Sequence, residues 1–203
     1  MSIVQGINGT VRKIPTWPLY ILGFIPAGVY LYWGITNQLG ADPVAALEHQ
    51  LGLWALQLLV ASLLFTPLRN WFNLNLIKFR RPVGLFAFYY TVFHLLTYLL
   101  LDKQLDWGPI IKDITKRPYI IVGVLALLAM IPLSITSNNW MIRKLGPVTW
   151  RRLHKLAYII ALFGAAHYML LVKAWPIEPI VYCLIMAFLV GYRFYKLRGR
   201  VFA

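Results

Sequence analysis

The sequence is poor in cysteine and in acidic residues, and both shortages exclude classes of protein. Cys183 is the single cysteine among 203 residues, so the chain has no intramolecular disulfide, no CxxC redox pair and no CxxCH haem-attachment motif. Asp and Glu number 6, and charged residues make up 13% of the chain, about half the fraction in an average soluble domain. Residues 1–13 lack the pattern of a cleaved signal peptide, so we expect the first membrane span to direct targeting.

The sequence is rich in long apolar runs. Hydrophobic residues make up 60% of the chain, and its mean hydropathy is +0.67. A helix needs about 20 apolar residues to cross the hydrocarbon core of a bilayer. Six segments meet this requirement: 17–36, 50–68, 82–101, 118–137, 153–172 and 177–195. The sequence therefore predicts an all-α membrane protein, a six-transmembrane-helix bundle that forms a single domain over residues 1–203.

The net charge of +14 lies in short clusters between the apolar runs, which argues against a basic face that binds nucleic acid. One alternating set of segments between spans holds 15 of the 20 Lys and Arg residues, and the other holds the remaining 5 with all 6 acidic residues. Because cytoplasmic loops carry the excess of Lys and Arg, we expect both the N- and the C-terminus to be cytoplasmic.

Histidines are the main candidates for chemistry, since an ionisable residue inside a span is a functional candidate by default. The chain has four: His49, His94, His154 and His167. His94 in the third span and His167 in the fifth precede Asp102 and Lys173 by eight and six residues, which places both roughly 9–12 Å below the outer surface. Two imidazoles at matched depth on separate helices suit the iron of a six-coordinate haem. The alternative is a neutral histidine packed against a neighbouring helix.

Other metal sites fit these spans less well. A zinc or di-iron site in a helix bundle requires carboxylates or further ligands nearby, and no acidic residue lies near the middle of any predicted span. Gly164, Ala165 and Ala166 precede His167 and would let a flat macrocycle approach the backbone, although small residues also serve ordinary helix packing.

His154 and Arg80 are candidates for a second site. His154 lies at the cytoplasmic end of the fifth span, about 140° around the helix from His167. Arg80 stands fourteen residues before His94, where a second bis-histidine haem would need its other ligand. Arginine instead suits an anion such as a haem propionate or a phosphate, or it simply anchors the span. His154 could hold a second haem or contact a quinone or a flavin, and His49 is expected to face headgroups.

Three stretches resemble a known family: "LGLWALQLLVASLLFTPLR", "RRPVGLFAFYYTVFHLLTYLLLD" and "WRRLHKLAYIIALFGAAHYMLLVKAW". They are similar to the haem-binding membrane subunits of the bacterial periplasmic methionine sulfoxide reductase system, the MsrQ or YedZ family of the ferric reductase-like transmembrane group. In that group two histidines on the third span and two on the fifth hold two b haems. His94, His154 and His167 match three of these positions, and Arg80 occupies the fourth.

The resemblance implies a bacterial inner-membrane subunit with haem b and bound FMN. It would take electrons from membrane quinol or a cytoplasmic flavin reductase and pass them to a periplasmic molybdopterin enzyme that repairs methionine sulfoxide. The chain has no GxGxxG turn for a dinucleotide, so we expect the catalytic chemistry to lie on a partner. The alternatives are a haem relay to another acceptor such as ferric iron, and a small membrane transporter or structural protein without haem.

Overall fold

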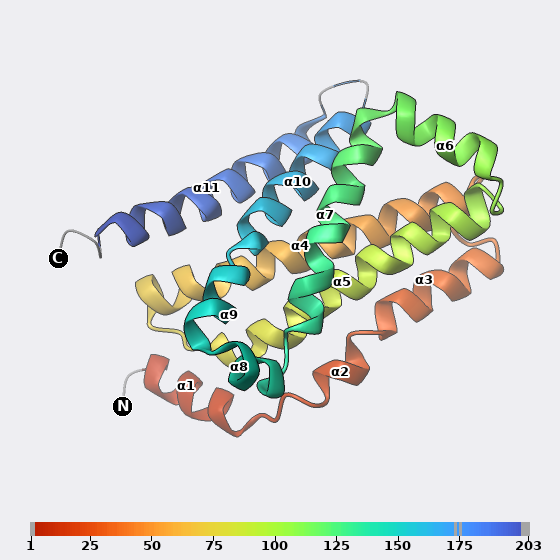
Figure 1. Ribbon diagram of the computed structural model, residues 1–203. Coiled ribbons are helices and arrows are strands. Elements are labelled where there is room, and N and C mark those ends of the chain that lie inside the picture. The colour runs from red at the N-terminus through yellow and green to blue at the C-terminus, as the bar shows by residue number, and fades with distance from the viewer. Residues whose placement is uncertain (1–2, 173, 175, 200–203) are drawn as a thin grey trace. The chain divides into compact units, whose positions relative to one another are not determined.

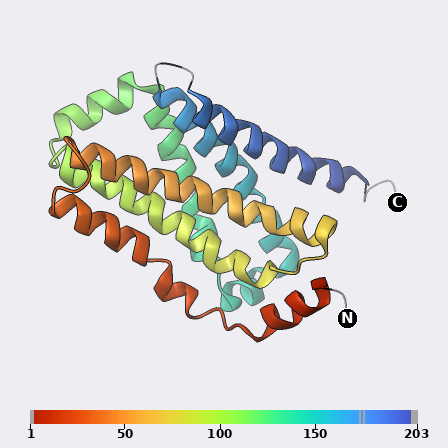
Figure 2. The same ribbon diagram turned by 180° about the vertical axis from the view of Figure 1, so that it is seen from behind.

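The computed structural model describes residues 3–172, 174 and 176–199, and this part of the chain is helical with no β-strand. The helices form two compact units, Met1–Asp106 and Trp107–Ala203 (Figures 1 and 2). The all-α fold class predicted from the sequence is confirmed for the described residues.

The first unit is built on two long helices, α4 and α5, that lie side by side in both views. Its elements are α1 (Ile3–Lys13), α2 (Leu19–Leu22), α3 (Ile25–Ile35), α4 (Pro43–Phe72), the short η1 (Ile77–Phe79), α5 (Arg80–Leu96) and the π-helical turn η2 (Thr97–Asp102). Asp42 caps α4 by accepting a hydrogen bond from the Ala45 N–H at 3.0 Å, and Pro43 suits the first helical position because its missing N–H needs no partner there. The buried core consists of Leu47, Leu51, Ala55, Phe86 and Tyr90.

The segment 17–36, predicted as a membrane span, is divided into two short helices in the structure. α2 ends at Leu22, and α3 begins at Ile25 with Pro26 in its first turn. Proline has no N–H for the preceding turn and its ring crowds that turn, so it starts a helix more readily than it continues one. The 11 residues of α3 rise about 16 Å, so this helix alone is shorter than the roughly 30 Å hydrocarbon core.

Tyr90 of α5 bridges the break between α2 and α3. Its hydroxyl donates to the Gly23 carbonyl at 2.8 Å and accepts from the Ala27 N–H at 3.1 Å. Gly23 also lies against the Phe86 ring, because a Cβ added to this glycine would stand 2.4 Å from the ring atoms. A single buried side chain therefore satisfies backbone groups that the interrupted helix leaves exposed.

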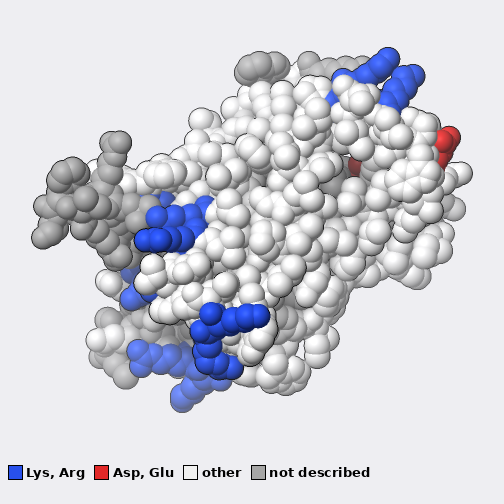
Figure 3. Space-filling view, in the orientation of Figure 1, with Lys and Arg blue, Asp and Glu red and all other residues white. Residues whose placement is uncertain are grey.

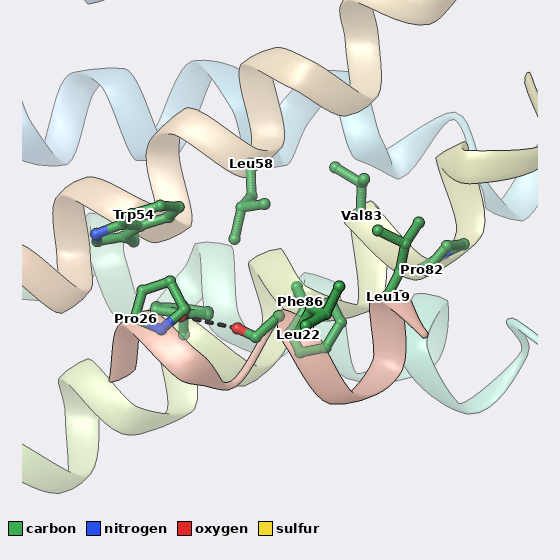
Figure 4. Close-up of a pocket in the computed structure, with 10 residues that line it drawn as sticks. Leu19, Leu22, Pro26, Trp54, Leu58, Pro82, Val83 and Phe86 are labelled. Atoms are coloured by element: carbon green, nitrogen blue, oxygen red, sulfur yellow. Dashed lines mark hydrogen bonds between the residues drawn. The ribbon is translucent and has the colours of Figure 1, made fainter. Parts of the chain in front are cut away.

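An apolar cavity of about 290 Å³ lies beside this break (Figure 4). Figure 4 shows Trp54 and Leu58 of α4 on one side, with Leu22 and Pro26 opposite. The remaining lining residues are Leu19, Gly23, Pro82, Val83, Phe86 and Tyr90. The lining contains no His, Cys, Asp or Glu side chain, the residue types that usually ligate metal ions.

The second unit is built on α7 and α10, which pack along each other, with α11 against α10. Its elements are α6 (Trp107–Lys116), α7 (Pro118–Ile135), α8 (Asn139–Leu145), α9 (Pro147–Leu153), α10 (Leu156–Leu171) and α11 (Ile177–Gly199). Asn138 caps α8 by accepting a hydrogen bond from the Met141 N–H at 2.8 Å. Gly146, at φ 75° and ψ 151°, takes a positive-φ conformation that favours glycine at the turn into α9.

Five segments of the described residues are long and apolar enough to cross a membrane: Pro43–Phe72, Ile77–Asp102, Pro118–Ile135, Pro147–Leu171 and Ile177–Tyr195. They correspond to the last five predicted spans. Large apolar side chains on these helices face outward; Leu128 and Leu184, for example, are 55% and 65% exposed. Outward apolar surface on several long helices is the pattern of a multi-pass membrane protein.

Charged residues mark the two ends of the long helices within each unit. α4 begins beside Asp42 and ends after Arg69, and α7 begins beside Asp113 and is followed by α8 with Arg143 and Lys144. Figure 3 shows Lys and Arg side chains gathered around α8, and a few acidic side chains together with Lys and Arg side chains near α6. The arrangement within each unit agrees with the predicted charge asymmetry, while the cytoplasmic location of the termini stays a prediction.

Candidate functional site

His94 lies in the last turn of α5, next to the second turn of α4. Its Nδ1 atom is 2.9 Å from the backbone carbonyl oxygen of Glu48. The side chain is half-buried where α4 and α5 pack together. One nitrogen of the ring is therefore held by the main chain of the neighbouring helix.

His167 is held in the same way in the second unit. It lies on α10, one turn before the end of the helix at Leu171. Its Nδ1 atom is 2.7 Å from the carbonyl oxygen of Tyr119, the second residue of α7, and the Tyr119 ring lies 5.9 Å from the imidazole between centroids. Each histidine thus lies near the end of one helix and contacts the main chain near the start of another.

These contacts determine the tautomer of both imidazoles. A carbonyl oxygen only accepts hydrogen bonds, so Nδ1 of His94 and of His167 must carry the hydrogen. In the neutral ring the lone pair then resides on Nε2, the form in which histidine ligates a metal. A metal-bound histidine commonly donates its other N–H to a backbone carbonyl or carboxylate, which fixes the ring and raises the basicity of the ligand. His94 and His167 both already make this hydrogen bond from the ring N–H to a backbone carbonyl.

A glycine accompanies each of the two carbonyl groups. Gly52 is the fourth residue after Glu48 in α4, and Gly123 is the fourth after Tyr119 in α7. The histidine rings lie directly over these glycines: a Cβ added to Gly52 would stand 3.1 Å from Nδ1 of His94, and one added to Gly123 would stand 2.7 Å from Nδ1 of His167.

His154 makes different contacts, at the turn between α9 and α10. Its Nε2 atom lies 3.0 Å from the Thr136 hydroxyl oxygen, and its ring stacks on Trp150 at 3.9 Å between centroids. The Thr136 hydroxyl donates to the Pro132 carbonyl at 2.6 Å, and the Trp150 indole N–H donates to the Thr136 carbonyl at 2.8 Å. Because the hydroxyl hydrogen points to Pro132, His154 Nε2 is the donor to Thr136. His154 thereby joins the end of α7 to the α9–α10 turn.

The other predicted residues lie at helix ends or on the surface. Arg80 is the first residue of α5 and is partly exposed, and His49 is an exposed residue of α4. His94 belongs to the first unit, whereas His154 and His167 belong to the second. Among the described residues, no group of three or more His, Cys, Asp or Glu side chains could hold a metal ion.

Comparison with known proteins places these helices in a family. The family described as "Ferric reductase like transmembrane component" matches residues 51–165, more than half of the chain. The chain is also 49% identical over 177 residues to the protein-methionine-sulfoxide reductase heme-binding subunits MsrQ of Brucella ovis, Brucella canis and Brucella abortus, an alignment that covers 87% of this chain and 80% of each relative. The chain belongs to the MsrQ family of ferric reductase-like transmembrane proteins. No solved structure matches it.

Membership of the MsrQ family confirms the resemblance seen in the sequence. The matched stretch of the ferric reductase-like family includes His94 and His154 and ends two residues before His167. Sequence reasoning identified the histidines but missed Gly52 and Gly123, because a glycine in an apolar helix has many explanations, most often close helix packing. Its contact with a histidine some forty residues away becomes visible only when the helices are packed.

Proposed function

We propose that this MsrQ family member is the haem-binding, electron-transferring membrane subunit of a bacterial methionine sulfoxide reductase system, with His94 and His167 as the axial ligands of one haem b. The relatives in Brucella are named heme-binding subunits. The observation that carries the proposal is that the two imidazoles have the same tautomer and the same type of hydrogen-bond partner. Each holds its Nδ1 hydrogen against a helix carbonyl, and each therefore presents Nε2 as a metal ligand.

The residues around the two histidines fit a haem better than a small metal ion. Two neutral nitrogen ligands are the complement that a six-coordinate haem iron needs from a protein, whereas structural zinc takes four protein ligands. When bound, haem b supplies a one-electron carrier within the membrane. The protein's own part is to orient the two imidazoles, to keep them neutral in apolar surroundings and to exclude water with the packed helices.

The contacts of His154 support a single haem. As the hydrogen-bond donor to Thr136, its Nε2 atom carries a hydrogen, whereas His94 and His167 both carry theirs on Nδ1. A neutral His154 would have its lone pair on Nδ1 instead, so it does not match the other two imidazoles. Arg80, in the position where the wider family has a fourth histidine, cannot ligate iron. We infer that Arg80 pairs with an anion such as a propionate or phosphate, and that His154 is a structural residue.

The membrane arrangement proposed here has six spans, the segment 17–36 included, with both termini in the cytoplasm and the chain in the bacterial inner membrane. The charge asymmetry supports this orientation. The electron donor would be membrane quinol or a cytoplasmic flavin reductase. Bound FMN is implied by the family resemblance, and the basic segments 78–81 and 143–152 could hold its phosphate.

The partner would be a periplasmic molybdopterin-dependent methionine sulfoxide reductase subunit that carries out the catalysis on oxidised envelope proteins. The residues 102–117, which include the exposed side chains of Trp107 and Ile111, would lie on the periplasmic side and offer a docking surface. Reoxidation of the reduced membrane subunit by the purified partner tests this assignment; the absence of reoxidation would overturn it.

Absorption spectra of protein purified from haem-supplied cells test the ligand assignment. The wild type should show a low-spin b-type spectrum that changes on reduction with dithionite. His94→Ala and His167→Ala should each abolish the low-spin signal, while His154→Ala and the exposed control His49→Ala should retain it. A colourless wild type would refute the haem proposal, and a normal spectrum in either ligand variant would refute the pairing.

A further inference from the structure

The two candidate ligand histidines lie in separate units, yet the local geometry around them is the same. In each case a histidine near the end of one helix donates Nδ1–H to a carbonyl of a second helix, and a glycine follows four residues after that carbonyl. We propose that Gly52 and Gly123 are positioning residues that give His94 and His167 access to these carbonyls and so set their tautomer and ring orientation. This inference rests on the proposed function.

The need for glycine follows from helix geometry. In an α-helix the carbonyl of residue i accepts the N–H of residue i+4, and the Cα–Cβ bond of residue i+4 tilts back toward the N-terminus, over that carbonyl. The oxygen has a second lone pair that can accept another hydrogen bond, but a side chain at i+4 covers the approach. Glycine at i+4 leaves the carbonyl open to an imidazole from a neighbouring helix.

The distances show that the two glycine positions differ in how well they would tolerate an added Cβ atom. A Cβ on Gly123 would meet Nδ1 of His167 at 2.7 Å and Cε1 at 3.0 Å, closer than van der Waals contact permits. A Cβ on Gly52 would meet Nδ1 of His94 at 3.1 Å and Cε1 at 3.3 Å, which a small shift of the ring can relieve. We therefore expect Gly123→Ala to have the larger effect and Gly52→Ala the smaller.

Displacing the ring changes the ligand and not only the packing. The Nδ1–H bond to the carbonyl raises the basicity of Nε2, and loss of such an outer partner typically weakens metal affinity about 10-fold to 100-fold. A less basic ligand also stabilises ferric iron less, so the midpoint potential should become more positive. Helix propensity acts in the opposite direction, since alanine in a helix interior stabilises the helix more than glycine does.

Two other glycines provide matched controls. Gly84 lies in α5, the helix that carries His94, and Gly191 lies in α11 of the second unit; a Cβ added to either meets nothing within 4 Å. The experiment compares Gly123→Ala, Gly52→Ala, Gly84→Ala and Gly191→Ala in the full-length protein. The measurements are the rate of haem transfer to apomyoglobin, the electron paramagnetic resonance spectrum of the ferric state and the midpoint potential, with circular dichroism to confirm folding.

We expect Gly52→Ala and Gly123→Ala to lose haem faster than the two control variants, with altered low-spin g values and a more positive midpoint potential. The effect of Gly123→Ala should be the larger of the two. If Gly123→Ala does not fold, the milder Gly52→Ala still decides the question. If Gly52→Ala and Gly123→Ala match Gly84→Ala and Gly191→Ala in all three measurements, the positioning role is overturned, while the ligand assignment stays intact. A wild type without haem would instead overturn the proposed function itself.

Discussion

Replacing Tyr90 by phenylalanine tests how the interrupted helix in the first unit is stabilised. The side chain is 1% exposed, and its hydroxyl joins the Gly23 carbonyl and the Ala27 N–H. Tyr90→Phe keeps the ring and its packing but removes both hydrogen bonds. Each is worth roughly 0.5–1.5 kcal/mol net, and interhelical bonds in membrane proteins have similar values. We expect the break between α2 and α3 to lose about 1–3 kcal/mol of stability.

Hydrogen exchange measured by mass spectrometry reports this loss directly. A loss of about 1–3 kcal/mol corresponds to roughly 5-fold to 150-fold faster exchange of the Ala27 amide, while the peptides of α4 should be unchanged. Tyr89→Phe is the matched control, because the Tyr89 hydroxyl makes no hydrogen bond within the described part of the chain. Equal exchange of the Ala27 amide in Tyr90→Phe, Tyr89→Phe and the wild type would refute this account of the break.

Two further substitutions test the cap of α4 and the hydroxyl group that contacts His154. Asp42→Ala removes the cap of α4 and should cost about 1 kcal/mol, seen as a lower unfolding temperature and faster exchange of the Ala45 amide; unchanged exchange there would contradict the capping role. Thr136→Val removes the acceptor of His154 and should cost about 1 kcal/mol with haem content per chain unchanged. Loss of about half of the haem in Thr136→Val would contradict the single-haem proposal.

Most of the fold follows from apolar runs that a bilayer-spanning helix requires. The last five predicted spans correspond to long apolar helices, since backbone groups in lipid must pair within the segment and an apolar run of that length has no other stable form. The span 17–36 could not be divided from the sequence alone. Gly23 and Pro26 are tolerated in many membrane helices, and here the break depends on Tyr90, which lies 63 residues after Ala27.

The candidate ligands were accessible to sequence reasoning for a similar physical reason. An imidazole is costly in an apolar span unless something binds it. His94 and His167 can therefore be recognised as candidate ligands from this one sequence. The same reasoning applied to His154 left its role open, because the hydroxyl that accepts its hydrogen bond belongs to Thr136, at the end of a different helix.

By itself, the sequence determined the helical membrane class, the MsrQ family and the identity of the histidines, because hydropathy and unusual polar residues are properties of the chain. Only the tertiary structure decided which ring nitrogen of His94 and His167 carries the hydrogen, and why glycine stands at positions 52 and 123. A tautomer depends on the partner that the other helix supplies, and the space above a glycine exists only once two helices have packed against each other.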